Sequence, residues 1–105
     1  MYSRVTLLEI DTTRIDAGHA VELFKREVVP RLHEQAGYEG VLVLSTPEGR
    51  GMLVSFWKTE EAADASVETG FYPEILAQYM TLFRSPPGRE HYEVAFAEMP
   101  GVTVG

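Results

Sequence analysis

The sequence predicts one α+β domain over residues 1–105, in which helices cover one face of an antiparallel sheet. Of its 105 residues, 45% are hydrophobic, which is enough for one core and leaves no room for a second domain. Four segments show the alternation or the apolar runs of strands, and the segments between them include helical spacing. Their β-α-β-β-α(α)-β order is that of ferredoxin-like folds.

The amino-terminal part of the chain predicts a strand and then a long helix. Residues 4–10 carry apolar side chains on both faces of the strand. Asp16 is a good N-cap for the helix, because apolar residues then recur every three or four positions as far as Leu32. Pro30 should kink this helix, since it cannot donate a hydrogen bond to the carbonyl four residues earlier. We expect Gly37 to end the helix at its C′ position.

The middle of the chain predicts a hairpin and a second helix. Residues 41–45 and 52–57 form the two strands, and the turn between them is rich in the residues that hairpins use. Thr59 is the expected cap of the helix, whose first turn carries acidic residues where exposed N–H groups favour negative charge. Gly70 is expected to end this helix.

The carboxyl-terminal part predicts a third helix and the last strand. Pro73 can open the helix at its first turn, and the Pro-Pro-Gly sequence after Ser85 should end it. Residues 91–98 alternate in the manner of a strand. Residues 99–105 have no pattern of their own and are expected to form a tail.

Charge and composition exclude several classes of protein. Sixteen acidic and nine basic side chains give a net charge of −7, and the basic residues are scattered. Nucleic acid and anionic membrane surfaces are therefore not expected as partners. The absence of cysteine excludes disulfides, thiolate metal sites and a Cys nucleophile. There is no signal-peptide pattern and no apolar run near the ~20 residues that cross a bilayer, so we expect a cytoplasmic protein.

The strands are too apolar for a sheet with one solvated face. Such a face shows polar residues at alternate positions, whereas Val41-Leu42-Val43-Leu44 is apolar on both faces. The simplest cover for the second face is the same face of another copy, with two sheets packed into a barrel by two-fold symmetry. The sequence therefore predicts a homodimer.

Three short stretches carry a resemblance to a known family. They are residues 35–40, the hairpin over 44–54, and Phe56-Trp57-Lys58-Thr59-Glu60-Glu61-Ala62-Ala63. These stretches are similar to the antibiotic biosynthesis monooxygenase family, whose members have a ferredoxin-like subunit that dimerises as an α+β barrel. The resemblance extends in element order from Arg4 to Glu98 and implies the same fold and the same kind of dimer.

The resemblance also implies an activity, that of a cofactor-independent monooxygenase acting on a small aromatic or polyketide-like compound. Some family members oxidise phenolic polycyclic substrates with neither metal nor flavin, a chemistry associated there with Asn, Trp and Tyr side chains. Trp57, Tyr72 and Tyr79 can supply the aromatic and phenolic groups, but the chain contains no Asn. No cofactor and no metal are expected.

Other members of the family resemble haem-degrading enzymes, which pair an Asn in the first strand with a Trp and a His in the second helical region. This chain has Ser66 near the place of that Trp, and Leu76 or Ala77 near that of the His. The three positions depart from the pattern together. The residues therefore argue against haem degradation.

The candidate site combines an apolar pocket with a few polar groups. The candidate catalytic residues are Tyr72, Tyr79 and His91, and the candidate substrate-binding residues are Trp57, Phe83 and Arg84. A phenolic hydroxyl can stabilise a developing anion. His91 shares a strand face with Glu93, and such a pair can act as a general base. Arg84 can accept an anionic group of a ligand.

The same residues also have structural interpretations. Trp57 ends a strand just before a helix cap, where its ring can plug the corner between sheet and helix. Tyr72 and Tyr79 can pack in the core, and Arg84 can be a solvated loop residue. Three functions remain open: a monooxygenase-like enzyme, a non-catalytic dimeric module that binds a lipophilic ligand or serves structure, and an isomerase or lactone-processing enzyme.

Overall fold

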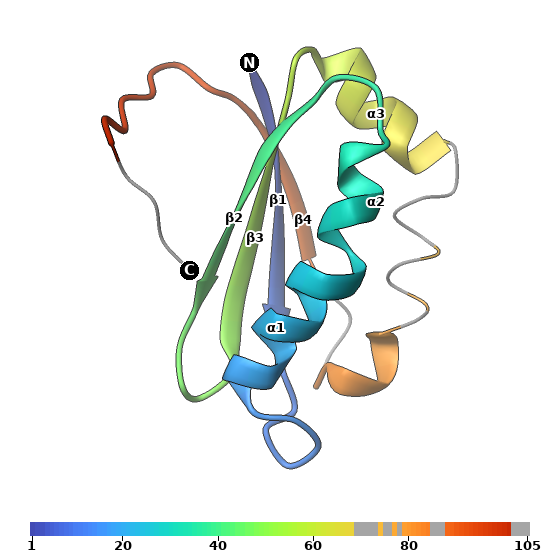
Figure 1. The fold of residues 1–105 in the computed structure, drawn as a ribbon, viewed down its shortest axis with the longest axis vertical. Helices are drawn as coiled ribbons and strands as arrows, with labels where there is room; N and C mark the ends of the chain where they lie inside the picture. The colour runs from blue at the N-terminus through green and yellow to red at the C-terminus, as the bar shows by residue number, and fades with distance from the viewer. Residues whose placement is uncertain (69–73, 75–76, 78, 85–87, 102–105) are drawn as a thin grey trace.

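The structure, a computed structural model, describes residues 1–68, 74, 77, 79–84 and 88–101. Strands and helices follow one another in the order that the sequence predicts (Figure 1). The elements are β1 (Tyr2–Glu9), α1 (Ala17–Glu27), α2 (Val29–His33), β2 (Tyr38–Ser45), β3 (Arg50–Trp57), α3 (Glu60–Glu68), the 3-10 helix η1 (Met80–Leu82) and β4 (Gly88–Glu93).

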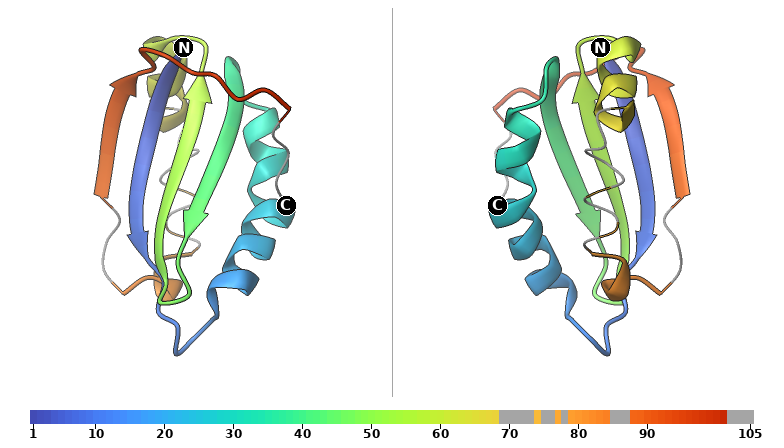
Figure 2. Two further views of the ribbon diagram at one scale, coloured as in Figure 1. Left: turned by 90° about the vertical axis from the view of Figure 1, so that its left-hand side faces the viewer. Right: turned by 90° about the vertical axis from the view of Figure 1, so that its right-hand side faces the viewer.

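The strands form one four-stranded antiparallel sheet with the order β2-β3-β1-β4. β1 pairs with β3 along its whole length, so that Tyr2 lies opposite Trp57 and Glu9 lies opposite Arg50. Helices α1, α2 and α3 lie on one face of this sheet, and the opposite face carries none of the described helices (Figures 1 and 2). This arrangement is the ferredoxin-like α+β fold that the sequence predicts.

Pro30 divides the long helix expected up to Leu32 into two. α1 ends at Glu27 and α2 begins at Val29. Pro30 has no N–H to donate to the carbonyl of Arg26, and its ring crowds that carbonyl. The interruption is therefore stronger than the kink that we expected.

Both predicted helix caps are present. The Oδ1 of Asp16 accepts a hydrogen bond from the backbone N–H three residues later at 2.9 Å. The hydroxyl of Thr59 accepts one from the N–H three residues later at 3.1 Å. Such bonds satisfy N–H groups that the first turn of a helix otherwise leaves free. The helix end predicted at Gly70 and the helix start predicted at Pro73 lie outside the described residues.

Gly37 lies in the turn before β2, and its prediction as a C′ residue is wrong. α2 ends earlier, at His33, with Glu34 as its C-cap. Gly37 has φ +80°, and a Cβ there would lie only 2.6 Å from the Cβ of Ala62 in α3. The backbone conformation and the close approach of α3 together require a glycine at this position.

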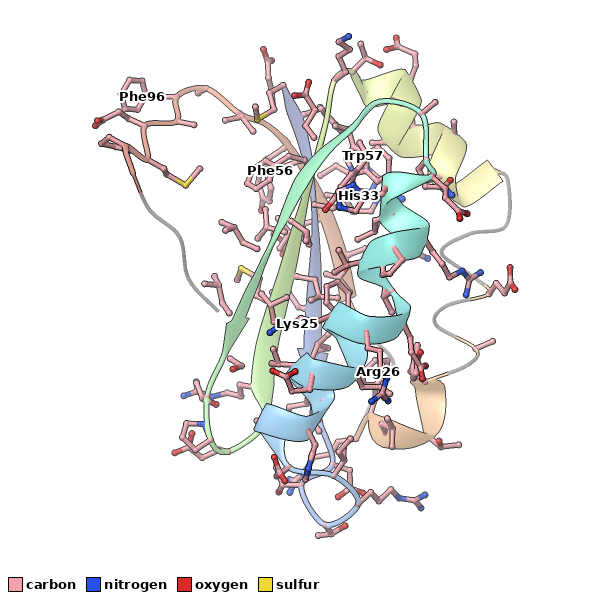
Figure 3. The ribbon with its side chains drawn as sticks, viewed as in Figure 1. Lys25, Arg26, His33, Phe56, Trp57 and Phe96 are labelled. Atoms are coloured by element: carbon pink, nitrogen blue, oxygen red, sulfur yellow. The ribbon has the colours of Figure 1, made fainter. Side chains whose placement is uncertain are left out.

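β4 lies earlier in the chain than the strand predicted at residues 91–98. It spans Gly88–Glu93, and its end pairs with Tyr2 at the start of β1. Because β1 begins there, the residues that follow have no partner strand in the described part of the chain. Residues 94–101 leave the sheet as an arm, in which Phe96 is 85% exposed (Figures 1 and 3).

The main core lies at the end of the sheet where α2 and α3 meet it. Its buried residues are Val28, Leu32, Trp57 and Ala63. Trp57 has no exposed surface, and its indole N–H donates to the Oγ of Ser55 at 2.9 Å (Figure 3). A large ring that is buried on all sides and has its polar atom satisfied agrees with the structural interpretation of Trp57.

A buried arginine ties α3 to the sheet. Arg4 in β1 is 1% exposed, and its Nη1 donates to the Oγ of Ser66 at 3.1 Å. Its Nη2 lies 3.8 Å from an oxygen of Asp64, and Ser66 donates in turn to the carbonyl of Ala63 at 2.6 Å. A buried guanidinium requires such partners, because its desolvation is otherwise strongly unfavourable. Ser66 therefore holds α3 in place.

Truncation of the core tryptophan should destabilise the fold. Trp57→Ala removes the ring that fills the space between sheet and helices, and we expect a loss of roughly 3–5 kcal/mol in the free energy of unfolding. Trp57→Phe keeps an aromatic ring and should lose clearly less. Urea denaturation of the three proteins measures both changes. An unchanged transition in Trp57→Ala would contradict the structural role of this ring.

Candidate functional site

An apolar pocket lies between α1, the helix-covered face of the sheet and η1. Its volume is about 110 Å³. Residues from all these walls line it, among them Leu8, Val21, Phe24, Val43, Leu53 and Phe83. An apolar cavity with a few polar groups at its border is the usual form of a small-molecule site. We therefore take this pocket as the candidate site.

The pocket exists because α1 does not close onto the sheet. No residue of α1 is buried, although its apolar side lines the pocket. Small residues leave space on both sides, namely Ala17 and Ala20 on α1 and Gly51 on β3. A Cβ at Gly51 would lie 2.7 Å from the Cδ1 of Leu8, so the glycine also makes room for that side chain. The helix layer is packed at the α2 and α3 end and open along α1.

Tyr79 is one of the residues that line the pocket, and its hydroxyl is bonded to a residue outside the lining. Its ring lines the wall, and its hydroxyl donates a hydrogen bond to the Oε2 of Glu27 at 2.5 Å. Burial, together with the adjacent Glu27 carboxylate, raises the pKa of Tyr79 to about 12. The phenol therefore stays protonated at neutral pH and remains a hydrogen-bond donor.

Two of the candidate residues meet in the wall of this pocket, Tyr79 and Phe83. Phe83 is half-buried, and its backbone forms an isolated antiparallel bridge with Ile10 just after β1. This bridge holds the end of η1 against the sheet and sets the position of the Phe83 ring. Tyr72 lies outside the described residues.

The structure places the other candidate residues away from the pocket. Trp57 belongs to the core at the α2 and α3 end. His91 is exposed on β4, with its ring 6.2 Å from that of Tyr2 in an edge-to-face arrangement. Arg84 is exposed, and its backbone N–H donates to the carbonyl of Glu9 at 2.9 Å. The predicted catalytic and binding residues are therefore not gathered at one point.

Glu27 is the hydrogen-bond partner of the lining residue Tyr79, a contact that sequence reasoning missed. It is the last residue of α1, and its side chain is 40% exposed. One carboxylate oxygen accepts from Tyr79, and the other lies 3.6 Å from the Nη2 of Arg26. Glu27 and Tyr79 are 52 positions apart, so no spacing in the sequence indicates their contact.

The part of the chain that the structure describes offers neither a metal centre nor a membrane span. No three of its His, Asp or Glu side chains are grouped so as to hold a metal ion. None of the helices there has the length and the apolar character needed to cross a bilayer.

Known structures share the fold of this chain, although no protein-family model and no curated protein matches its sequence. A monooxygenase from the gene ActVA-Orf6 of Streptomyces coelicolor, in complex with nanaomycin D, is 18% identical with a TM-score of 0.73. The match covers 94% of this chain and 91% of that one. A Nitrosomonas europaea protein assigned as an antibiotic biosynthesis monooxygenase is also 18% identical, with a TM-score of 0.72 and coverage of 91% and 100%.

A further similar structure is a variant of MhuD with two manganese protoporphyrin IX molecules bound per active site. It is 20% identical, with a TM-score of 0.65, and the match covers 94% of this chain and 99% of that one. At such identities the similarity establishes the fold alone. The resemblance to antibiotic biosynthesis monooxygenases that the sequence shows is thus confirmed at the level of the fold.

The pKa of Tyr79 provides a test of its contact with Glu27. Because this pKa is raised above the ordinary value of about 10, the hydrogen bond contributes its full stabilisation below that pH. The contribution is lost as the pH rises through about 12. The near-ultraviolet absorbance titration of wild type minus Tyr79→Phe should therefore show one phenol that ionises near pH 12. A difference titration centred near pH 10 would show that the contact is absent in solution.

Proposed function

We propose that this protein is a homodimeric, cofactor-independent monooxygenase-like enzyme that acts on a small aromatic or polyketide-like compound in the cytoplasm. The observation that carries the proposal is the apolar pocket with the Tyr79 phenol at its border. The shared fold supports it, since one similar structure is a monooxygenase in complex with nanaomycin D. The pocket of this chain is bounded by apolar surfaces that suit a ring system.

The substrate itself supplies the electrons in the proposed reaction. An anthrone-like phenol loses a proton, and the resulting anion reduces O₂. In the complete reaction a ring CH₂ becomes C=O, with one oxygen atom entering the product and the other leaving as water. The apolar walls hold the ring and exclude water. The hydroxyl of Tyr79, once released from Glu27, can donate to the substrate oxygen and stabilise its negative charge.

The helix-free face of the sheet supports the proposed homodimer. Leu7, Leu42 and Leu44 on this face are 37%, 40% and 52% exposed. By the strand register, Val54 lies beside Leu42 on the same face, and Phe56 points away from the helices (Figure 3). A contiguous apolar surface of this kind usually marks an interaction site. The same face of a second copy covers it with matching chemistry.

A second candidate function is a non-catalytic module that binds a lipophilic ligand. The nearly uniform apolar wall favours it, because a reaction through an anion needs polar groups that face the substrate. The chain also lacks any Asn to fill the position associated with the oxygenase chemistry in the family. In this alternative the pocket and the dimer are the same, but the bound compound is not converted to a product.

Oxygen uptake by the purified protein separates the two candidates. With a panel of hydroquinones and anthrone-like phenols, we expect turnover above the autoxidation of each compound in buffer, with no added flavin, haem or metal and in the presence of a chelator. Tyr79→Phe should lower kcat by about 10-fold or more, because a donor to a developing anion is lost. Tyr92→Phe, which removes a phenol–carboxylate hydrogen bond to Glu90 on the helix-free face and leaves the pocket lining unchanged, is the matched control. Ligand binding that raises the melting temperature without turnover favours the binding module.

The proposed dimer predicts a position where a charge is not tolerated. Leu42→Asp would place a carboxylate on the helix-free face, where it would be buried without a partner between two sheets. We expect this variant to be monomeric, unfolded or aggregated, whereas Pro47→Asp in the exposed hairpin turn should behave as wild type. Sedimentation equilibrium measures the outcome. A wild-type protein that is a stable monomer at micromolar concentration would refute the dimer.

A further inference from the structure

α1 is the least anchored of the α-helices that the structure describes. It has no buried residue, and its apolar side borders the pocket, whereas α2 and α3 each contribute buried residues to the core. Its first residue follows the loop that ends at Asp16, and its last turn is separated from α2 by the interruption at Pro30. Phe24 near the end of α1 packs against that core, and the turns before it can move away from the sheet with the loss of few packed side chains.

The contact between Glu27 and Tyr79 joins α1 to another wall of the pocket. Glu27 ends α1, and Tyr79 immediately precedes η1, the element that leads to Phe83. The bond joins a phenol to a carboxylate, and such charge-assisted hydrogen bonds are stronger than neutral ones. Arg26 lies 3.6 Å from the second oxygen of Glu27 and helps to orient the carboxylate. The two walls are held together at the place where they meet.

The pocket between these walls is small for the proposed class of ligand. Its volume of about 110 Å³ is below that of an engineered apolar cavity of about 150 Å³ that admits benzene. Small-molecule pockets usually start at about 300 Å³. A single ring or a short alkyl group suits the pocket with little adjustment. A fused-ring compound requires the walls to separate.

We infer that the Glu27–Tyr79 hydrogen bond is a latch that determines which ligands enter the pocket. While the bond is made, the pocket accepts one-ring compounds; when it breaks, α1 moves outward and fused-ring compounds can bind. Opening also releases the Tyr79 hydroxyl, which can then donate to an oxygen of the ligand. The inference rests on the proposed use of this pocket for ligands. The association rate of a fused-ring ligand is then lowered by the small fraction of open molecules.

Two variants that remove the latch from opposite sides test the inference. Tyr79→Phe keeps the ring and removes the donor, and Glu27→Met keeps the length of the side chain and removes the acceptor. The matched control is Glu22→Gln, on the exposed side of α1, where Glu22 pairs with Lys25. Toluene serves as the one-ring probe and 1-aminoanthracene as the fused-ring probe. Toluene binding is followed by NMR shifts, and the association rate of 1-aminoanthracene by its fluorescence.

We expect each latch variant to increase the association rate of 1-aminoanthracene about 10-fold or more, the factor expected for loss of a hydrogen bond to a charged group. Toluene affinity should change less than about 2-fold. The double variant should bind 1-aminoanthracene no faster than either single variant does, because the two substitutions remove the same hydrogen bond. Each single variant tests the latch independently. If one of them fails to fold, the association rate of the other still tests the inference.

Two outcomes would overturn the inference in different ways. In the first outcome, toluene and 1-aminoanthracene both bind, and 1-aminoanthracene associates with every variant at the wild-type rate. The latch is then refuted, whereas the proposed use of the pocket for ligands is retained. If neither probe binds the wild-type protein, the proposed use of the pocket fails, and the latch fails with it.

Discussion

The packing of Trp57 against the residues of α2 and α3 is the contact on which the rest of the helix layer depends. This packing fixes Leu32 and Ala63 on the sheet. The guanidinium of Arg4 in β1 also donates to Ser66 and so fixes α3 on the sheet. Pro30 interrupts the helix between Val28 and Leu32, and α1 reaches this cluster through Phe24 near its end. One end of the layer is a closed core, and the other end is a pocket.

The division of the helix layer also separates the closed core from the candidate site. Trp57, the largest aromatic residue and a natural candidate for a binding site, is used entirely by the core. Tyr79 lines the pocket and also packs against the core, and its hydroxyl donates to Glu27, which lies outside the lining. Known structures of this fold are 18–20% identical to the chain in the matches described above. Their chemistry can therefore differ widely, because a shared fold does not determine the reaction.

The sequence predicts the elements whose signals are local. Alternation over residues 4–10, the cap at Asp16 and the cap at Thr59 all concern neighbours within a few positions, and the structure agrees with each. The last strand is predicted too late in the chain, at residues 91–98 and not Gly88–Glu93, because the end of β4 depends on where its partner β1 begins. Alternation alone does not contain that information.

The candidate site is harder to predict than the fold, for a related reason. Phe83 and Tyr79 are in the pocket, but in the sequence only their residue types and the family resemblance indicate them. Glu27 is exposed and lies at the end of a helix, where a charged residue is ordinary. Its role depends on a contact 52 positions away. Only the tertiary arrangement distinguishes it from Glu22, the other acidic side chain of α1.

The position of the single tryptophan determines what the intrinsic fluorescence of this protein reports. Trp57 has no exposed surface, and the Tyr38 ring lies 5.9 Å away, close enough to pass excitation energy to it. Its emission maximum therefore reports whether the closed end of the helix layer is folded, and it responds little to unfolding of α1. Far-ultraviolet circular dichroism, in contrast, counts the residues of α1. In a uniformly packed domain the two signals change together. Here a loss of ellipticity that precedes the shift in emission would identify α1 as a unit that unfolds on its own.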